Sequence, residues 1–239
     1  MNHLIAAPPP AWQARGRLDS ERAIGYTSPV RVTEIHAAIQ GETQHAGRPC
    51  ALVRLTGCDL RCSYCDTEYA FAGGTEMSLD AVLAAVADLG QRLVLVTGGE
   101  PLLQREVPQL CQRLLDAEHE VVLETSGAHD VAVLPAGVAR IVDLKTPASG
   151  ESARNRWENL DLLGPRDAVK LVLCDRADYL WALDVIRTRS CGGAEILLSP
   201  VHGRLDPRDL CSWMLADRVP ARLNLQLHKL VYGWDARGV

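Results

Sequence analysis

The sequence predicts an α/β fold, organised as a partial, open βα barrel of about six units. Two observations predict it. From residue 30 onward, short apolar runs alternate with segments of helical spacing, which is the pattern of βα units around a parallel sheet. These units fall short of the eight that close a barrel. In such sheets, binding and catalytic groups gather at the carboxyl ends of the strands.

The strands are expected where apolar and β-branched residues follow one another in short runs, as in buried parallel strands. These runs are Ala51–Leu55, Leu93–Val96, Val121–Glu124, Ile141–Leu144, Val169–Leu173, Glu195–Leu198 and Leu223–Gln226.

The helices are expected between these strands. Ser78 is placed to cap a helix over Leu79–Leu89, and Gly90 is placed to end it. Further helix-length segments are Arg105–Glu118, Arg176–Arg189 and Pro207–Leu215.

The domain organisation is simple. Residues 1–28 are rich in Pro, Arg and Ala and show no periodic apolar pattern, so we expect a poorly ordered N-terminal extension. Residues 29–239 then form one catalytic domain, and no internal repeat or further linker is found.

Composition excludes several classes of partner. The 239 residues are 47% hydrophobic and 23% charged with a net charge of −5, which gives no electrostatic reason to expect a nucleic acid or a membrane as partner. No apolar run approaches the ~20 residues of a membrane helix, and the N-terminus lacks the apolar stretch of a signal peptide. We therefore expect a cytoplasmic protein. Its eight cysteines are then more typical of metal binding or catalysis than of disulfides.

Three cysteines follow the strand Ala51–Leu55 closely. Cys58, Cys62 and Cys65 have the spacing C-x3-C-x2-C, and a compact loop can direct three thiolates at one centre. An iron–sulfur cluster usually takes four thiolates, so three leave one iron open for a ligand. The alternative is a zinc site with Cys50 as its fourth ligand. Cys50 lies eight residues before Cys58, across a strand, and zinc sites favour paired C-x2-4-C units.

A second motif ends the strand Leu93–Val96. The residues Thr97, Gly98, Gly99, Glu100 and Pro101 follow it. The two glycines allow close approach of a backbone, and Glu100 can pair with a cation. Such a turn is common by itself. Because it ends the next core strand after the cysteine triplet, the two motifs are interpreted together.

The two motifs together resemble the signature of the radical S-adenosylmethionine (SAM) superfamily. From about residue 30 onward the chain also resembles the 7-carboxy-7-deazaguanine synthase family. The segments that carry this resemblance are IQGETQHAGRPCALVRLTGCDLRCSYCDTEYAF, VTGGEPLLQ, VVLETSG, VDLKTPASGE, ENLDLL, DAVKLVL and LQLHKL.

The resemblance implies a fold, a reaction and cofactors. It implies the radical SAM partial barrel, a [4Fe–4S] cluster, SAM and Mg²⁺. In the family, a 5′-deoxyadenosyl radical takes a hydrogen atom from C6 of 6-carboxy-5,6,7,8-tetrahydropterin, the ring contracts, and ammonia leaves. The product, 7-carboxy-7-deazaguanine, belongs to queuosine and 7-deazapurine biosynthesis, and SAM is regenerated. The resemblance further implies a homodimer and an electron donor such as flavodoxin.

The resemblance also implies roles for single residues. Cys58, Cys62 and Cys65 would hold the cluster. Thr67 would be a Mg²⁺ ligand, although chemistry alone favours the carboxylate of Asp66. The expected SAM-binding residues are Tyr64, Gly98, Gly99, Glu100, Ser126, Lys145 and Ser199.

The pterin site is implied in the same way. The expected substrate contacts are Ile39, Gln40, Gly41, Glu42, Arg54, Thr97, His228 and Val239. Arg54 lies in the middle of a strand, where a charge is costly to bury unless it is paired, and its fork suits a substrate carboxylate. A structural ion pair is the alternative for Arg54. The contact of Val239 stays open, because residues 230–239 extend beyond the end of members whose terminal carboxylate reaches the substrate.

Two other functions compete with this interpretation. A radical SAM activase, which makes a glycyl radical on a partner protein, needs no pterin pocket, so Arg54 and the segment Gln40–Glu42 argue against it. A zinc-binding module without enzymatic activity belongs to a different class, and it would be colourless where an iron–sulfur protein is brown.

Overall fold

A single nine-stranded sheet organises the computed structural model, which describes residues 28–233, 236 and 238. The strand order is β3-β1-β2-β4-β5-β6-β7-β8-β9. β1 pairs antiparallel with β2 and β3, and all other neighbours are parallel. The strands are β1 (Val30–Ile39), β2 (Pro49–Leu55), β3 (Thr75–Met77), β4 (Leu93–Gly98), β5 (Glu120–Thr125), β6 (Ala139–Leu144), β7 (Ala168–Leu173), β8 (Glu195–Pro200) and β9 (Arg222–Leu223).

The open form of the sheet confirms the predicted partial barrel. β3 and β9 are its two edges, and β2 and β4 to β8 are the strands expected from the apolar runs. The run Leu223–Gln226 was predicted wrongly as a full strand. β9 ends at Leu223, because the buried side chain of Asn224 bonds to groups of the first loop and of β8, and a short helix begins at Leu227.

The sequence pattern of β1 explains why it was not predicted. A β-bulge shifts its register between Val32 and Glu34. Val32 and Ile35 therefore both face the hydrophobic core, while Glu34 stands directly beside Arg54 of β2. A bulge adds one unpaired residue and re-aims the side chains after it, so β1 lacks the strict alternation of a regular strand.

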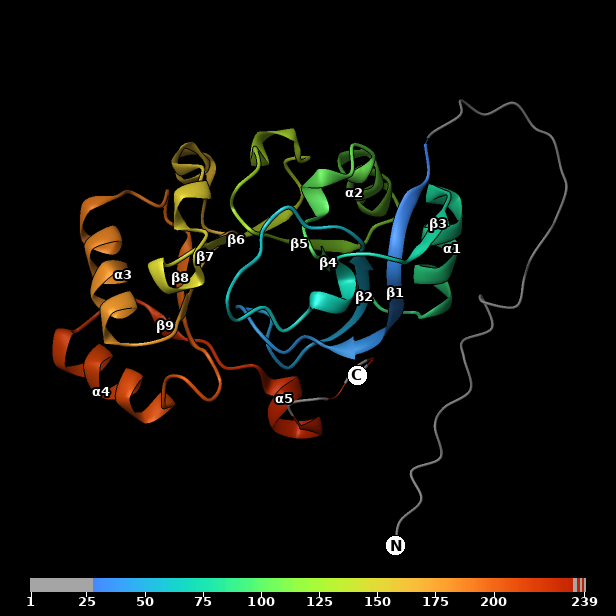
Figure 1. The fold of residues 1–239 in the computed structure, drawn as a ribbon. Coiled ribbons are helices and arrows are strands. Elements are labelled where there is room, and N and C mark those ends of the chain that lie inside the picture. Colours follow the sequence, from blue (N-terminus) through green and yellow to red (C-terminus); the bar gives the residue numbers. More distant parts are fainter. Residues whose placement is uncertain (1–27, 234–235, 237, 239) are drawn as a thin grey trace, which may run out of the picture.

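In the part of the chain that the structure describes, five α-helices connect or flank the strands: α1 (Leu79–Asp88), α2 (Val107–Asp116), α3 (Arg176–Thr188), α4 (Pro207–Asp217) and α5 (Leu227–Tyr232). The first four lie where the sequence places them. Ser78 Oγ accepts a hydrogen bond from Ala81 N of α1 at 3.2 Å, and Gly90 follows that helix with φ +65°, a value that suits glycine. Figure 1 shows α1 and α2 near one end of the sheet and α3 and α4 near the other.

Alternation along the strands separates two faces of the sheet. One face packs against the helices and forms the main core, with residues such as Val53, Val96 and Leu171. The opposite face carries a smaller apolar cluster near the strand starts, which includes Leu52 and Leu95. Arg54 is the next residue after Leu52 on that second face. Polar residues near the strand ends therefore lie beside this smaller apolar cluster, which we call the apolar floor.

The longest described helix, α3, has 13 residues, fewer than the ~20 that span a bilayer. No helix in the described ranges is long and apolar enough to cross a membrane. The predicted extension, residues 1–28, lies outside the described residues except for Ser28, and so does Val239.

Candidate active site

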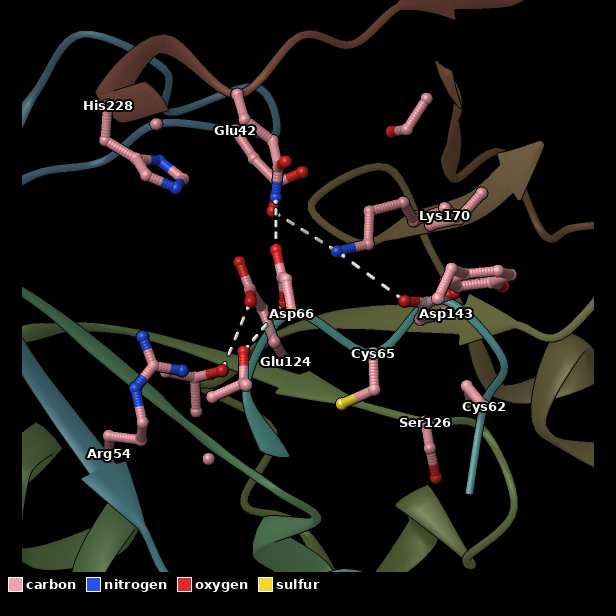
Figure 2. A pocket seen from close by; sticks show the side chains of 18 of the residues that line it. Glu42, Arg54, Cys62, Cys65, Asp66, Glu124, Ser126, Asp143, Lys170 and His228 are labelled. Carbon is pink, nitrogen blue, oxygen red and sulfur yellow. Dashed lines mark hydrogen bonds and ion pairs between the residues drawn. The ribbon is translucent and has the colours of Figure 1, made fainter. Parts of the chain in front are cut away.

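A cavity of about 540 Å³ lies on the second face of the sheet (Figure 2). It is walled by the loop after β2, the ends of the parallel strands, the loop 40–48 and α5. The structure brings nearly all predicted site residues together there. Those that line it are Ile39, Gln40, Gly41, Glu42, Arg54, Cys58, Cys62, Tyr64, Cys65, Thr67, Thr97, Gly98, Gly99, Ser126, Lys145, Ser199 and His228.

The three cysteines lie on one loop, which protein contacts hold in place. Ser63 N donates to Ser149 O at 3.0 Å, and Cys65 N donates to Cys62 O at 3.1 Å. Arg204 adds a bond from a terminal nitrogen to Ser63 O at 2.9 Å. Figure 2 shows Cys62 and Cys65 along the same wall of the cavity. The loop is therefore held by a hydrogen bond within it and by contacts with distant parts of the chain.

The three thiols line one cavity, as the ligands of one iron–sulfur cluster must. Burial raises the pKa of Cys62 to about 11 and also raises that of Cys58 and Cys65, so iron must displace a proton from each thiol. No group of three Cys, His, Asp or Glu side chains within the described ranges, these three cysteines included, is arranged to hold a single metal ion. Cys50 is buried in the apolar floor at the start of β2, away from the loop that follows the end of that strand.

The two glycines at the end of β4 are required by the close approach of the chain at the end of β2. A Cβ on Gly98 would lie 2.4 Å from Leu55 O, and one on Gly99 would lie 2.3 Å from Gly57 O and 2.8 Å from Cys58 Cβ. Real Cβ atoms do not approach so closely. The predicted close approach of a backbone is therefore present, with the loop after β2 as the partner.

Glu100 stands behind the cavity wall rather than in it. Its side chain is fully buried. Oε1 accepts from Leu102 N at 2.9 Å, Oε2 accepts from Ser126 N at 2.7 Å, and the Thr125 hydroxyl donates to the same carboxylate at 2.9 Å. The carboxylate thus joins the end of β4 to the end of β5 and positions Ser126, which lines the cavity.

Buried polar atoms mark the side of the cavity near β6. Lys145 Nζ lies 3.1 Å from Asp143 Oδ2; burial lowers the pKa of Lys145, but Asp143 raises it, and the net shift is upward. The other Asp143 oxygen and the Tyr64 hydroxyl are buried without a hydrogen-bond partner among the described residues. Two such groups at one cavity suit a polar ligand such as SAM.

A line of alternating charges crosses the cavity from the loop 40–48. Lys170 Nζ lies 3.3 Å from Glu42 Oε2 and 3.6 Å from Asp143 Oδ2. Burial lowers the pKa of Lys170, but Glu42 and Asp143 raise it well above its ordinary value. Burial raises the pKa of Glu42 more than Lys170 lowers it. These contacts hold the loop against the far strands of the open sheet.

Lys170, Asp143 and Glu124 were not among the predicted site residues. Each is a polar side chain in or at the end of an apolar strand, and each lines the cavity. The alternation of side chains along a strand could have found them, because each lies two residues after a member of the apolar cluster on the second face of the sheet. Residues two apart in a strand share one face of the sheet, so these side chains point toward the cavity.

The loop 40–48 and α5 close the cavity together. Leu227 N donates to Gly41 O at 2.8 Å, and Thr43 N donates to Asn224 Oδ1 at 2.8 Å. A Cβ on Gly41 would lie 2.0 Å from His228 Nδ1, so this glycine admits the imidazole. Burial lowers the pKa of His228, which favours the neutral ring near pH 7. Thr43 has φ +66°, a strained value for a β-branched residue.

Arg54 projects from β2 toward the centre of the cavity (Figure 2). Its Nε donates to Glu34 Oε1 at 2.6 Å, and the Tyr69 hydroxyl donates to the same oxygen at 3.0 Å. Burial lowers the pKa of Arg54, but Tyr69 and Glu34 raise it above its ordinary value. The structural ion pair expected as the alternative exists, and the same side chain also lines the cavity.

Thr67 and Asp66 lie side by side at the mouth of the cysteine loop. Thr67 Oγ1 donates to Asp66 Oδ1 at 2.8 Å, and the other Asp66 oxygen accepts from Gln226 and from Lys229 of α5. Burial raises the pKa of Asp66, but Lys229 and these hydrogen bonds lower it well below its usual range. The Thr67 hydroxyl directs its proton at Asp66, so its lone pairs are left for a cation.

Comparison with known proteins gives consistent results. The family model of the radical SAM superfamily matches residues 52–148. A 7-carboxy-7-deazaguanine synthase from Koribacter versatilis is 42% identical over 226 residues, which cover 88% of this chain and 100% of the relative. One from Chlorobaculum tepidum is 44% identical over 216 residues and covers 89% and 98%. The crystal structure of QueE from Escherichia coli shares the fold, with a TM-score of 0.70, 22% identity and coverage of 84% and 95%.

The length and level of these matches decide the family, and the cavity carries most of the side chains that the family resemblance predicts. The chain belongs to the 7-carboxy-7-deazaguanine synthase family of the radical SAM superfamily.

Proposed function

We propose that this chain converts 6-carboxy-5,6,7,8-tetrahydropterin to 7-carboxy-7-deazaguanine, with loss of ammonia, inside the cavity. One observation carries the proposal: a single cavity brings the three thiols of the cysteine loop to the same space as the buried polar groups of Gln40, Glu42 and Arg54. An activase for a partner protein has no use for this second set. Membership of the synthase family supports the same reaction.

Two groups of residues are suited to hold the cofactors. Cys58, Cys62 and Cys65 would ligate the [4Fe–4S] cluster, and SAM would lie between Gly99, Ser126 and Lys145, which line the adjoining part of the cavity. Bound there, cluster and SAM supply the 5′-deoxyadenosyl radical that starts the reaction. The protein's contribution is placement and exclusion of water.

The opposite side of the cavity would hold the pterin. Gln40 and Glu42 are buried and can bond to the donor-rich amide and amine edge of the ring. Arg54 would receive the carboxylate. Thr97 and His228 line the same region. Because these groups are already fixed by protein contacts, the pocket is formed before the substrate enters.

For magnesium we propose Thr67 as the protein ligand. Mg²⁺ keeps most of its waters and uses substrate oxygens, so a single hydroxyl ligand is sufficient. The hydrogen bond from Thr67 to Asp66 supports this role, since it leaves the hydroxyl lone pairs free.

For the assembly we propose a homodimer, and for the electron donor a flavodoxin; both rest on the family resemblance. Size-exclusion chromatography with light scattering tests the first, and turnover driven by reduced flavodoxin tests the second.

The reaction is tested with anaerobically purified, iron-loaded protein. With SAM, a reductant and Mg²⁺, we expect the tetrahydropterin to yield 7-carboxy-7-deazaguanine, detected by mass spectrometry. Deuterium at C6 should appear in 5′-deoxyadenosine or return to the product. If SAM is cleaved while the pterin is recovered unchanged, the proposed reaction is wrong and the activase reading gains support.

A further inference from the structure

The contact between Glu34 and Arg54 raises an electrostatic question. Arg54 is the cation suited to a substrate carboxylate, yet Glu34 places a negative charge 2.6 Å from its Nε. Like charges repel, so Glu34 opposes the arrival of a second carboxylate on the same guanidinium. We therefore expect Glu34 to contribute to the orientation of Arg54 rather than to the charge of the site.

The guanidinium of Arg54 has two edges that can bind a carboxylate. A guanidinium can receive a carboxylate along the edge formed by Nε and one terminal nitrogen, or along the edge formed by its two terminal nitrogens. In the described part of the chain, the side-chain hydrogen bonds of Arg54 end at Glu34, through Nε. The first edge is therefore taken, and the second is left to face the cavity.

The chain fixes Glu34 from three directions. The bulge in β1 turns Glu34 to the cavity side, directly opposite Arg54 in the strand register. The Tyr69 hydroxyl donates to the same Oε1 atom at 3.0 Å, and His36 Nε2 lies 3.8 Å from Oε2. The side chains of Glu34 and Arg54 are 20% and 16% exposed, so solvent competes little for either.

We propose that Glu34 is a positioning residue: it holds Arg54 by Nε, so that the substrate carboxylate is received end-on by the two terminal nitrogens. The inference rests on the proposed function, in which Arg54 binds the carboxylate. Tyr69 supports Glu34 through the hydrogen bond from its hydroxyl.

Two substitutions separate orientation from charge. Glu34→Gln keeps an acceptor oxygen at the same reach and removes the charge. Glu34→Asp keeps the charge and shortens the side chain by one methylene, which breaks the 2.6 Å contact. Glu76→Ala is the matched control, because Glu76 makes a cross-strand pair with Arg31 at 2.9 Å on the exposed edge of the same sheet.

The measurement is the ratio of two dissociation constants, for 6-methylpterin and 6-carboxypterin, on iron-loaded protein with SAM. Neither oxidised pterin requires turnover, and they differ by the carboxylate. We expect a lower ratio, on the order of 10-fold, for Glu34→Asp, since a small displacement of a binding group is costly. Glu34→Gln should keep the ratio or raise it, and Glu76→Ala should not change it.

The contrary outcomes are distinct. A Glu34→Asp ratio equal to that of the wild type, or a Glu34→Gln ratio that falls as far as that of Glu34→Asp, overturns the positioning role and leaves the proposed function intact. A general structural defect changes both dissociation constants equally and also overturns it. If wild-type protein binds both pterins equally, Arg54 is not the carboxylate site, and the inference fails together with that part of the proposed function.

Discussion

Charged side chains inside an apolar sheet are costly unless other groups compensate them, and the residues in and behind the cavity wall show three ways of doing so. Arg54 is paired with Glu34. Lys170 stands between two carboxylates. Glu100 accepts hydrogen bonds from two backbone amides and a hydroxyl. Each compensation also fixes an orientation, so stability and preorganisation of the site have the same cause.

Thr67 and Asp66 allow a test at the residue scale. If Thr67 donates a hydroxyl ligand to Mg²⁺, Thr67→Ala should lower activity and raise the Mg²⁺ concentration for half-maximal rate, on the order of 10-fold for loss of a ligand contact. Thr67→Ser should retain most of both. The measurement is a Mg²⁺ titration of turnover, with iron content checked in each variant.

Asp66→Asn is the rival in the same titration. The Asp66 carboxylate is already engaged by Lys229, Gln226 and Thr67, so we expect a smaller change in Mg²⁺ dependence than for Thr67→Ala. Should Asp66→Asn shift the titration while Thr67→Ala does not, the carboxylate is the ligand and the assignment to Thr67 is wrong.

At the scale of elements, the imidazole that α5 places beside the loop 40–48 depends on one glycine. Gly41→Ala would place a Cβ 2.0 Å from His228 Nδ1, so His228 must leave its position. We expect Gly41→Ala to raise KM for the tetrahydropterin about 10-fold or more, because displaced contact groups weaken binding, while iron content stays at the wild-type level. Steady-state kinetics and iron analysis measure the two effects.

Gly164→Ala is the control for this variant. A Cβ on Gly164 would meet nothing within 4 Å, and its φ is not in the left-handed region. KM should not change there. An unchanged KM in Gly41→Ala would show that the imidazole and α5 do not shape the substrate pocket.

The elements also show how far sequence reasoning reaches. Strands such as Leu93–Gly98 were predictable because parallel strands covered on both faces are nearly continuous apolar runs. Helices with a clear cap, such as α1, were predictable as well. β1 and α5 were missed because tertiary contacts define them: a bulge beside β2 fixes the first, and docking on Gly41 fixes the second.

The site divides in the same manner. Residues within motifs, such as Cys58 and Gly98, could be placed from the sequence. Glu34 and Lys170 could not be assigned roles, because their partners lie 20 and 128 positions away along the chain. A polar residue in a strand shows that some partner is needed, and the strand order decides which partner it receives.

At the scale of the whole molecule, we expect the scaffold not to depend on the cluster. The main core runs along all eight strands from β1 to β8 and along the four longer helices, α1 to α4. The cysteine loop lies outside it and is held by Ser149, Arg204 and Glu151 through hydrogen bonds of its own. A zinc finger, by contrast, is unfolded without its metal, because metal ligation replaces a core.

The last prediction follows from this difference. A variant with Cys58, Cys62 and Cys65 all changed to Ser should purify colourless and without iron, yet keep the far-ultraviolet circular dichroism of the wild type. Its urea unfolding should be one cooperative transition, with a free energy of unfolding within about 2 kcal/mol of that of metal-free wild type, since half-buried Cys→Ser changes leave the core intact.

Cys50→Ser, at a buried site in the apolar floor, is the control. It should lose more stability than any single change in the loop while keeping its iron. Loss of cooperative unfolding in the triple variant would mean that the cluster organises the fold; brown colour in it would mean that these three thiols are not the ligands.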